Sequence, residues 1–288
     1  MFSGSYVALV TPFNDGKVDL DKLGDLVDFH IGEGTDGLVP CGTTGESATM
    51  TPEEHEIVIR AVVERAGGKV PVLAGTGSNS TDEAIRFTRF AQDIGADGAL
   101  LITPYYNKPT QAGLVQHFEA IARNTSLPLV LYNVPSRTGV NMLPPAVIEC
   151  SKLPNVIGIK EASGSVDQTV EILRGSDLAI LSGDDSLTLP LMSVGATGVI
   201  SVAANVAPRM VADMVRFANN GDFAAARELH MKLFPLFDIL FVETNPIPAK
   251  AAMVLQNRVG PELRLPMTQL SEKHMPALKR IMTEVGLL

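Results

Sequence analysis

Short, continuous apolar runs recur along this chain, most of them about 20 to 35 residues apart. They do not alternate between apolar and polar residues, and this is typical of parallel strands that are covered on both faces. Parallel strands need a crossover between them, usually a helix, so the spacing predicts repeated strand–helix units. The eight predicted strands are residues 6–10, 38–41, 70–74, 99–102, 129–132, 156–160, 178–181 and 199–202.

The segments between these runs carry helix start and stop signals. Thr51 and Glu54 predict a capping box with a proline at the first helical position, and Ser80–Glu83 and Ser165–Gln168 predict two more. A glycine-bearing repeat stands where helices lead into strands, at residues 34–37, 95–98 and 195–198. Its first glycine suits a left-handed helix end, and its second lets the chain turn into the next strand.

Eight such units in about 220 residues are the number required for a closed barrel. A doubly wound open sheet is the alternative, but the chain lacks a dinucleotide-binding fingerprint and its units are evenly spaced, which favours closure. The sequence therefore predicts an α/β fold, a (β/α)8 TIM barrel with a C-terminal helical extension. We expect residues 1–222 to form the barrel with the active site and residues 223–288 to form the extension.

Charge and composition exclude several functional classes. The formal net charge of −9 and the absence of a basic run argue against nucleic-acid binding. Two separated cysteines make no disulfide framework, and they indicate free thiols in a reducing compartment. The N-terminus has no basic leader, and no apolar run is long enough to span a membrane. We expect a cytoplasmic protein.

Catalytic residues of a barrel enzyme lie at the carboxyl ends of its strands. The residues that follow the predicted strands are mostly hydroxyls, with tyrosines, one arginine and one lysine. The five histidines fall in helical segments instead, so a metal-dependent hydrolase or class II aldolase is disfavoured. We expect no metal and no organic cofactor.

Lys160 ends a strand that we expect to be fully buried, because the preceding residues are apolar. A buried ammonium group is costly unless it is paired or neutral. Either Glu161 or another carboxylate forms a structural ion pair with it, or its neutral amine attacks a keto group to form an imine. Tyr132 and Tyr106 with Thr44 would then carry protons. Backbone N–H groups of residues 42–44 would bind a carboxylate.

Six motifs occur in order along the chain, and together they are specific enough to indicate one family. They are GTTGE (42–46), PYYNKP (104–109), YNVPSRTG (132–139), GIKEASG (158–164), SGDD (182–185) and NPIPAK (245–250). With them the chain closely resembles the dihydrodipicolinate synthase family of pyruvate-dependent class I aldolases, over essentially its whole length. The resemblance implies a lyase that condenses pyruvate with L-aspartate 4-semialdehyde to 4-hydroxy-tetrahydrodipicolinate, in lysine (diaminopimelate) biosynthesis.

The resemblance also assigns roles to matching positions. Lys160 would form the Schiff base, and Tyr132, Thr44 and Tyr106 would relay protons, with Tyr106 reaching into the neighbouring subunit of a homotetramer built as a dimer of dimers. Thr43 would hold the pyruvate carboxylate, and Arg137 the carboxylate of the semialdehyde. Gly183 and Ile200 would line the pyruvate pocket.

Purely structural roles for the same residues also remain open as alternative interpretations. Tyr105 and Tyr106 could be packing residues at the barrel mouth, and Arg137 could pair with Glu161 or Asp184. Residues 182–185 could cap the helix that follows them, and for these four residues we favour a capping role over a catalytic role.

A second set of positions resembles the site at which many family members bind L-lysine as a feedback inhibitor. The matching residues are Ser47, Ala48, His55, Asn79, Glu83 and Tyr105. Two other functions compete with the synthase reaction. One is a related pyruvate-dependent aldolase, such as a sialic-acid lyase or a keto-deoxy sugar-acid aldolase, and the other is a catalytically silent paralogue. Arg137 favours the synthase, and the intact lysine and tyrosines disfavour a silent protein.

Overall fold

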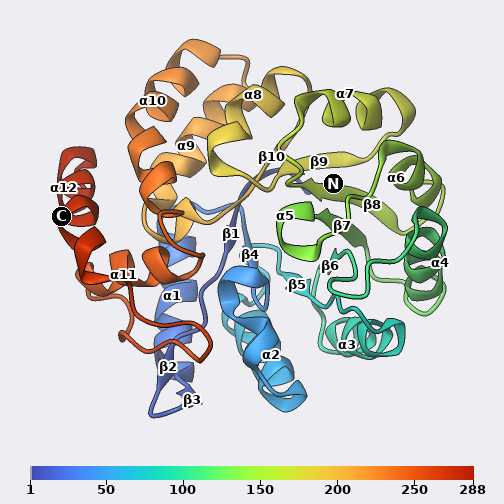
Figure 1. Cartoon of the computed structure of the whole chain (residues 1–288), viewed down its shortest axis with the longest axis horizontal. Coiled ribbons are helices and arrows are strands. Elements are labelled where there is room, and N and C mark those ends of the chain that lie inside the picture. The colour runs from blue at the N-terminus through green and yellow to red at the C-terminus, as the bar shows by residue number, and fades with distance from the viewer. Residues whose placement is uncertain (1) are drawn as a thin grey trace.

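The computed structural model describes residues 2–288, and within them eight parallel strands form a barrel (Figure 1). The strands pair in the order β4-β1-β10-β9-β8-β7-β6-β5, and a bridge between Leu38 and Val72 joins the two ends of this series. This confirms the predicted closed barrel. The strands are β1 (Gly4–Ala8), β4 (Gly37–Val39), β5 (Leu73–Gly75), β6 (Gly98–Ile102), β7 (Leu129–Asn133), β8 (Val156–Glu161), β9 (Ala179–Ser182) and β10 (Gly198–Ser201).

Helices surround the barrel, and their apolar faces pack against the outer faces of the strands. A smaller apolar cluster fills the barrel interior and includes Tyr132 and Ile200. Among the helices of residues 2–288, none is long and apolar enough to cross a membrane. The surrounding helices are α1 (Leu20–Gly32), α2 (Pro52–Ala66), α3 (Thr81–Asp93), α4 (Gln111–Ala122), α6 (Pro144–Cys150), α7 (Val166–Gly175), α8 (Thr188–Ser193) and α9 (Pro208–Asn219).

The glycine repeat has a steric cause at the amino end of the barrel. Gly34, which follows α1, has a φ of 81°, as expected for a left-handed helix end. The second glycine of each repeat begins a strand where a side chain would collide. A Cβ at Gly37 would lie 2.0 Å from the Tyr6 ring, and one at Gly98 would lie 2.6 Å from Phe2. Phe2 and Tyr6 meet edge to face and fill this end of the barrel.

The predicted helix starts are confirmed in part. The Thr51–Glu54 capping box at α2 is complete, with both reciprocal hydrogen bonds formed. At α7, Ser165 accepts a hydrogen bond from the Gln168 backbone N–H. The predicted box at Ser80 is wrong, because the Glu83 carboxylate accepts a hydrogen bond from the Ser78 hydroxyl, 2.5 Å away.

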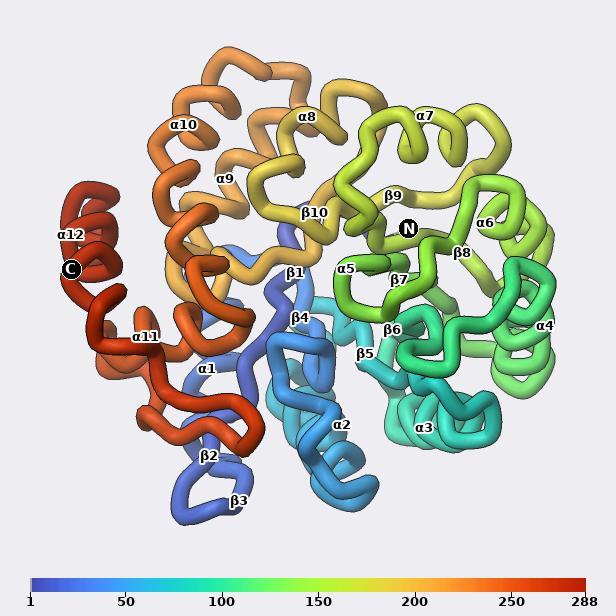
Figure 2. The backbone as a smooth tube through the Cα atoms, in the orientation of Figure 1, coloured from blue at the N-terminus to red at the C-terminus, as the bar shows by residue number. Residues whose placement is uncertain are grey.

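Three further helices follow the barrel, α10 (Phe223–Ile239), α11 (Ile247–Leu255) and α12 (Met275–Val285). The loop between α11 and α12 returns to the barrel and runs beside α2 and a hairpin that the sequence did not predict (Figure 2). This hairpin consists of β2 (Phe13–Asn14) and β3 (Lys17–Val18). Helix α10 packs along α9 and α12, and the boundary at residue 222 stays a prediction.

Candidate active site

Lys160 lies at the carboxyl end of β8 and points into the barrel. Its side chain is only 6% exposed, and its Nζ lies 4.2 Å from the centre of the Tyr132 ring on neighbouring β7. Among residues 2–288, Nζ has no hydrogen-bond or ion-pair partner. Gly183 makes room for it, because a Cβ at that position would lie 3.2 Å from Lys160 Cε and 2.6 Å from Ala162 Cβ. The amine is therefore packed against a phenol ring and available for chemistry.

Glu161 does not pair with Lys160. Successive side chains of a strand point to opposite faces, so its carboxylate faces away from the barrel interior. There it accepts hydrogen bonds from Asn133 Nδ2, from Gln168 Nε2 and, at 2.6 Å, from the Ser163 backbone N–H. Burial raises the pKa of Glu161, and these hydrogen bonds oppose the shift. The ion-pair interpretation of these two residues is therefore wrong.

Two aspartates are the acidic groups whose charge interacts with Lys160. Burial raises the pKa of both Asp184 and Asp185, and the Lys160 charge opposes the shift. Asp185 accepts hydrogen bonds from the Ser201 hydroxyl and from the backbone N–H groups of Val202 and Ala203. It therefore caps the turn after β10, and the prediction that residues 182–185 cap the helix that follows them is wrong. That helix has no side-chain cap.

The Gly42–Glu46 loop continues from β4 and forms a short 3₁₀ turn, η1 (Thr43–Gly45). Thr44 is buried, and its Oγ1 accepts a hydrogen bond from Asn245 Nδ2 at 3.0 Å. Cys41, just before the loop, is buried, and its thiol contacts the His55 carbonyl oxygen. Burial raises the Cys41 pKa above its usual range, as expected for a packed and unreactive thiol.

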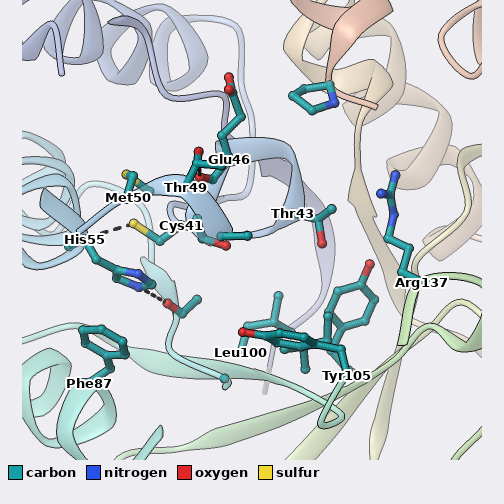
Figure 3. A pocket seen from close by; sticks show the side chains of 18 of the residues that line it. Cys41, Thr43, Glu46, Thr49, Met50, His55, Phe87, Leu100, Tyr105 and Arg137 are labelled. Carbon is teal, nitrogen blue, oxygen red and sulfur yellow. Dashed lines mark hydrogen bonds between the residues drawn. The ribbon is translucent and has the colours of Figure 1, made fainter. Parts of the chain in front are cut away.

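A cavity of about 380 Å³ is lined in part by this loop and runs from Arg137 at one end to His55 and Phe87 at the other (Figure 3). The residues predicted for the substrate and lysine sites that line it are Thr43, Ser47, Ala48, His55, Glu83, Tyr105, Tyr132 and Arg137. The predicted residues outside its lining are Lys160, Thr44, Tyr106, Asn79, Gly183 and Ile200. Lys160 is nevertheless joined to the cavity through its contact with Tyr132.

The His55 end of the cavity is held by specific contacts. His55 Nε2 donates a hydrogen bond to the Gly75 carbonyl oxygen at 2.7 Å, and its ring stacks on Phe87 at a centroid distance of 4.3 Å. Burial lowers the pKa of His55 and so favours the neutral ring. Asn79 donates a hydrogen bond to the Tyr105 carbonyl oxygen and thereby holds the loop that carries Tyr105.

Arg137 lies in the short helix α5 (Pro135–Thr138) at the other end. Its guanidinium donates one long hydrogen bond, 3.4 Å, to the Asn245 carbonyl oxygen. Within residues 2–288 it forms no ion pair with Glu161 or Asp184, so the interpretation of a structural pair is wrong. An exposed guanidinium at a cavity wall suits a ligand carboxylate.

Sequence reasoning missed the contribution of the C-terminal segments to this cavity. Asn245, Pro246 and Met267 line it, although they follow the last barrel strand by more than 40 residues. The signal was present in the NPIPAK motif, which carries an asparagine and a lysine in apolar surroundings. Among residues 2–288, no group of three or more His, Cys, Asp or Glu side chains is placed to hold a metal ion.

The barrel and its site define a class of enzyme. An unpaired lysine at the end of a barrel strand, packed against a tyrosine ring on the neighbouring strand, is the arrangement of a class I aldolase-type lyase. The chain belongs to the dihydrodipicolinate synthetase family, whose model it matches over residues 1–285. It is 50% identical to the 4-hydroxy-tetrahydrodipicolinate synthase of Syntrophus aciditrophicus, with complete coverage of both chains.

Solved structures agree with this assignment. The dihydrodipicolinate synthase of Aquifex aeolicus superposes with a TM-score of 0.98 at 48% identity over 99% of both chains. Chloride-inhibited dihydrodipicolinate synthase from Acinetobacter baumannii, solved as a complex with pyruvate, has a TM-score of 0.98 at 44% identity over the whole of both chains. DHDPS from Cyanidioschyzon merolae, solved with lysine bound, has a TM-score of 0.96 at 43% identity over 100% of this chain and 99% of that one.

Proposed function

We propose that the enzyme condenses pyruvate with L-aspartate 4-semialdehyde to 4-hydroxy-tetrahydrodipicolinate, with loss of one water, in the diaminopimelate route to lysine. The observation that carries this proposal is the buried, unpaired amine of Lys160 against the Tyr132 ring in a chain of this family. Both cysteines are buried free thiols, which suits an enzyme of the reducing cytoplasm.

The first half of the reaction activates pyruvate. The Lys160 amine attacks the keto carbon, water leaves, and a protonated imine forms. Thr43 and the backbone of its loop hold the pyruvate carboxylate, and Gly183 and Ile200 shape the space around the imine. The relay of Tyr132, Thr44 and Tyr106 then removes a proton from the methyl carbon, and the electron pair moves into the imine to give an enamine.

The second half forms the carbon–carbon bond and closes the ring. The enamine carbon attacks the aldehyde carbon of the semialdehyde, and the relay returns a proton to the aldehyde oxygen. Arg137 holds the semialdehyde carboxylate, for which a guanidinium is the best-matched partner. The substrate amine then attacks the imine carbon and releases Lys160, so one water is lost in the overall reaction.

Borohydride trapping tests this function. Reducing the enzyme in the presence of pyruvate is expected to fix a pyruvate-sized adduct on Lys160, located by intact mass and peptide mapping. The trapped imine is shared with sialic-acid lyases and keto-deoxy sugar-acid aldolases, so the acceptor is tested separately. We expect turnover with L-aspartate 4-semialdehyde and none with sugar aldehydes, because the guanidinium of Arg137 suits a short carboxylated acceptor. Absence of an adduct would contradict the mechanism.

We also propose a homotetramer built as a dimer of dimers. Tyr106 is 88% exposed and has a φ of 73°, a left-handed conformation that is rare for an aromatic residue. This exposed, left-handed conformation is explained if Tyr106 of one subunit completes the proton relay of the neighbouring subunit. A dimer of dimers supplies that neighbour and buries the ring.

L-Lysine is the inhibitor that we propose for the His55 end of the cavity. Glu83 supplies a carboxylate for its ammonium groups, and Ser47 and Ala48, which follow Glu46, line the same cavity. Asn79 and Tyr105 complete the set from the neighbouring loop. The cavity joins this end to Arg137 and Tyr132, so an occupant here shares one cavity with these two residues.

Sedimentation velocity and a lysine titration of initial rates test these two proposals together. We expect the mass of a tetramer and rates that fall as lysine is added. Rates that stay constant across the titration would contradict the lysine site. A monomer with full activity would contradict the role given to Tyr106.

A further inference from the structure

Asn245 lies between α10 and α11, outside the barrel strands, yet it contacts both halves of the active site. It is 3% exposed and lines the cavity. Its side-chain Nδ2 donates to Thr44 Oγ1 at 3.0 Å, and its carbonyl oxygen accepts from Arg137 Nη2 at 3.4 Å. One residue thus joins the proposed proton relay to the proposed acceptor site, across 201 and 108 residues of sequence.

We propose that Asn245 is a positioning residue that fixes the hydroxyl of Thr44 for proton transfer. The proposal rests on the relay role given to Thr44 above. A threonine hydroxyl has one O–H donor and two acceptor lone pairs. The Asn245 amide occupies one lone pair, and this leaves one donor and one acceptor. A relay member needs those two, one to receive a proton and one to pass it on.

The segment that carries Asn245 is anchored to the loop that carries Thr44. Lys250, five residues later, forms a buried ion pair with Glu46, 2.5 Å between Nζ and Oε1. The Arg264 backbone N–H donates to the other Glu46 oxygen at 3.0 Å. These contacts fix the two segments relative to each other, so the Asn245–Thr44 hydrogen bond joins two rigidly held groups.

The test separates the relay from imine formation. Enzymes that form an enamine from pyruvate exchange its methyl hydrogens with deuterium in D2O, and NMR measures this exchange without the second substrate. We expect Asn245→Leu, which keeps the branched shape and removes the amide, to give normal borohydride trapping of pyruvate. Its methyl exchange and kcat should fall roughly 10- to 100-fold, as expected when a proton-transfer group loses its orientation. The control Glu243→Gln, two residues earlier and outside the cavity lining, should behave as wild type.

A double-mutant cycle with Thr44→Val shows whether Asn245 acts through Thr44. In the Thr44→Val background, Asn245→Leu should slow exchange no further. An additive loss, or unchanged exchange in the single variant, would overturn the proposal. If Asn245→Leu does not fold, as judged by circular dichroism, Asn245→Ala replaces it in the same cycle. Failure of the wild-type enzyme to trap pyruvate would instead refute the proposed function.

Discussion

Replacing Lys160 with methionine should reduce turnover by roughly 10³- to 10⁶-fold, because the reaction loses its only covalent attachment point for pyruvate. Methionine matches the length of the lysine stem and suits a side chain that is 6% exposed beside a tyrosine ring. Since the Lys160 amine has no ion-pair partner among residues 2–288, its removal breaks no ion pair, and nearby Asp185 keeps its hydrogen bonds from Ser201 and the backbone. The variant should therefore fold normally. Steady-state rates and thermal unfolding measure the two expectations.

Two matched variants give the controls. Lys160→Arg keeps a cation of similar length, but a guanidinium stays protonated and cannot form an imine, so this variant should be as inactive as Lys160→Met. Lys108→Met removes an exposed lysine at the barrel mouth and should keep full borohydride trapping of pyruvate. Trapping that persists in Lys160→Met, or an adduct that maps to Lys108, would contradict the assignment of the nucleophile.

The barrel itself could be predicted because its causes are local. Each strand is a short apolar run, and the glycines that begin β4, β6 and β10 repeat at the same place in their units. The strand order then follows from connecting consecutive parallel strands through helices. The hairpin of Phe13 and Val18 was missed because two residue pairs make too short a pattern to recognise.

The candidate site could be predicted only where a residue lies at the end of a strand or in the loop that follows it. Lys160, Tyr132 and Thr44 belong to this group, and strand alternation alone could have shown that Glu161 faces away from Lys160. Asn245 reaches the site through tertiary packing across 201 residues, which no local pattern encodes. The predicted capping box at Ser80 is wrong for a similar reason, because the Glu83 carboxylate accepts a hydrogen bond from the Ser78 hydroxyl in the preceding loop.

The buried pair of Lys250 and Glu46 is the contact on which we expect stability to depend most. Their side chains are 1% and 2% exposed, and Lys250 Nζ also donates to the Glu262 carbonyl oxygen and lies over the Phe13 ring. Burial lowers the pKa of Lys250, and the Glu46 charge opposes the shift. Lys250→Met would leave the Glu46 carboxylate buried without its ion-pair partner, which costs about 3–5 kcal/mol of folding free energy. Urea denaturation measures this loss.

A double variant that removes both charges distinguishes the loss of the ion pair from the cost of burying one unpaired charge. The double variant Glu46→Gln/Lys250→Met should recover much of the lost stability, because a neutral amide still accepts the Arg264 N–H and carries no buried charge. The exposed pair of Lys152 and Glu149 gives the control, and Lys152→Met should change stability by less than about 0.5 kcal/mol. Wild-type stability in Lys250→Met would contradict the anchoring role. Because Glu46 directly follows the loop of Thr43 and Thr44, the destabilised variant should also lose pyruvate trapping at temperatures well below its unfolding midpoint.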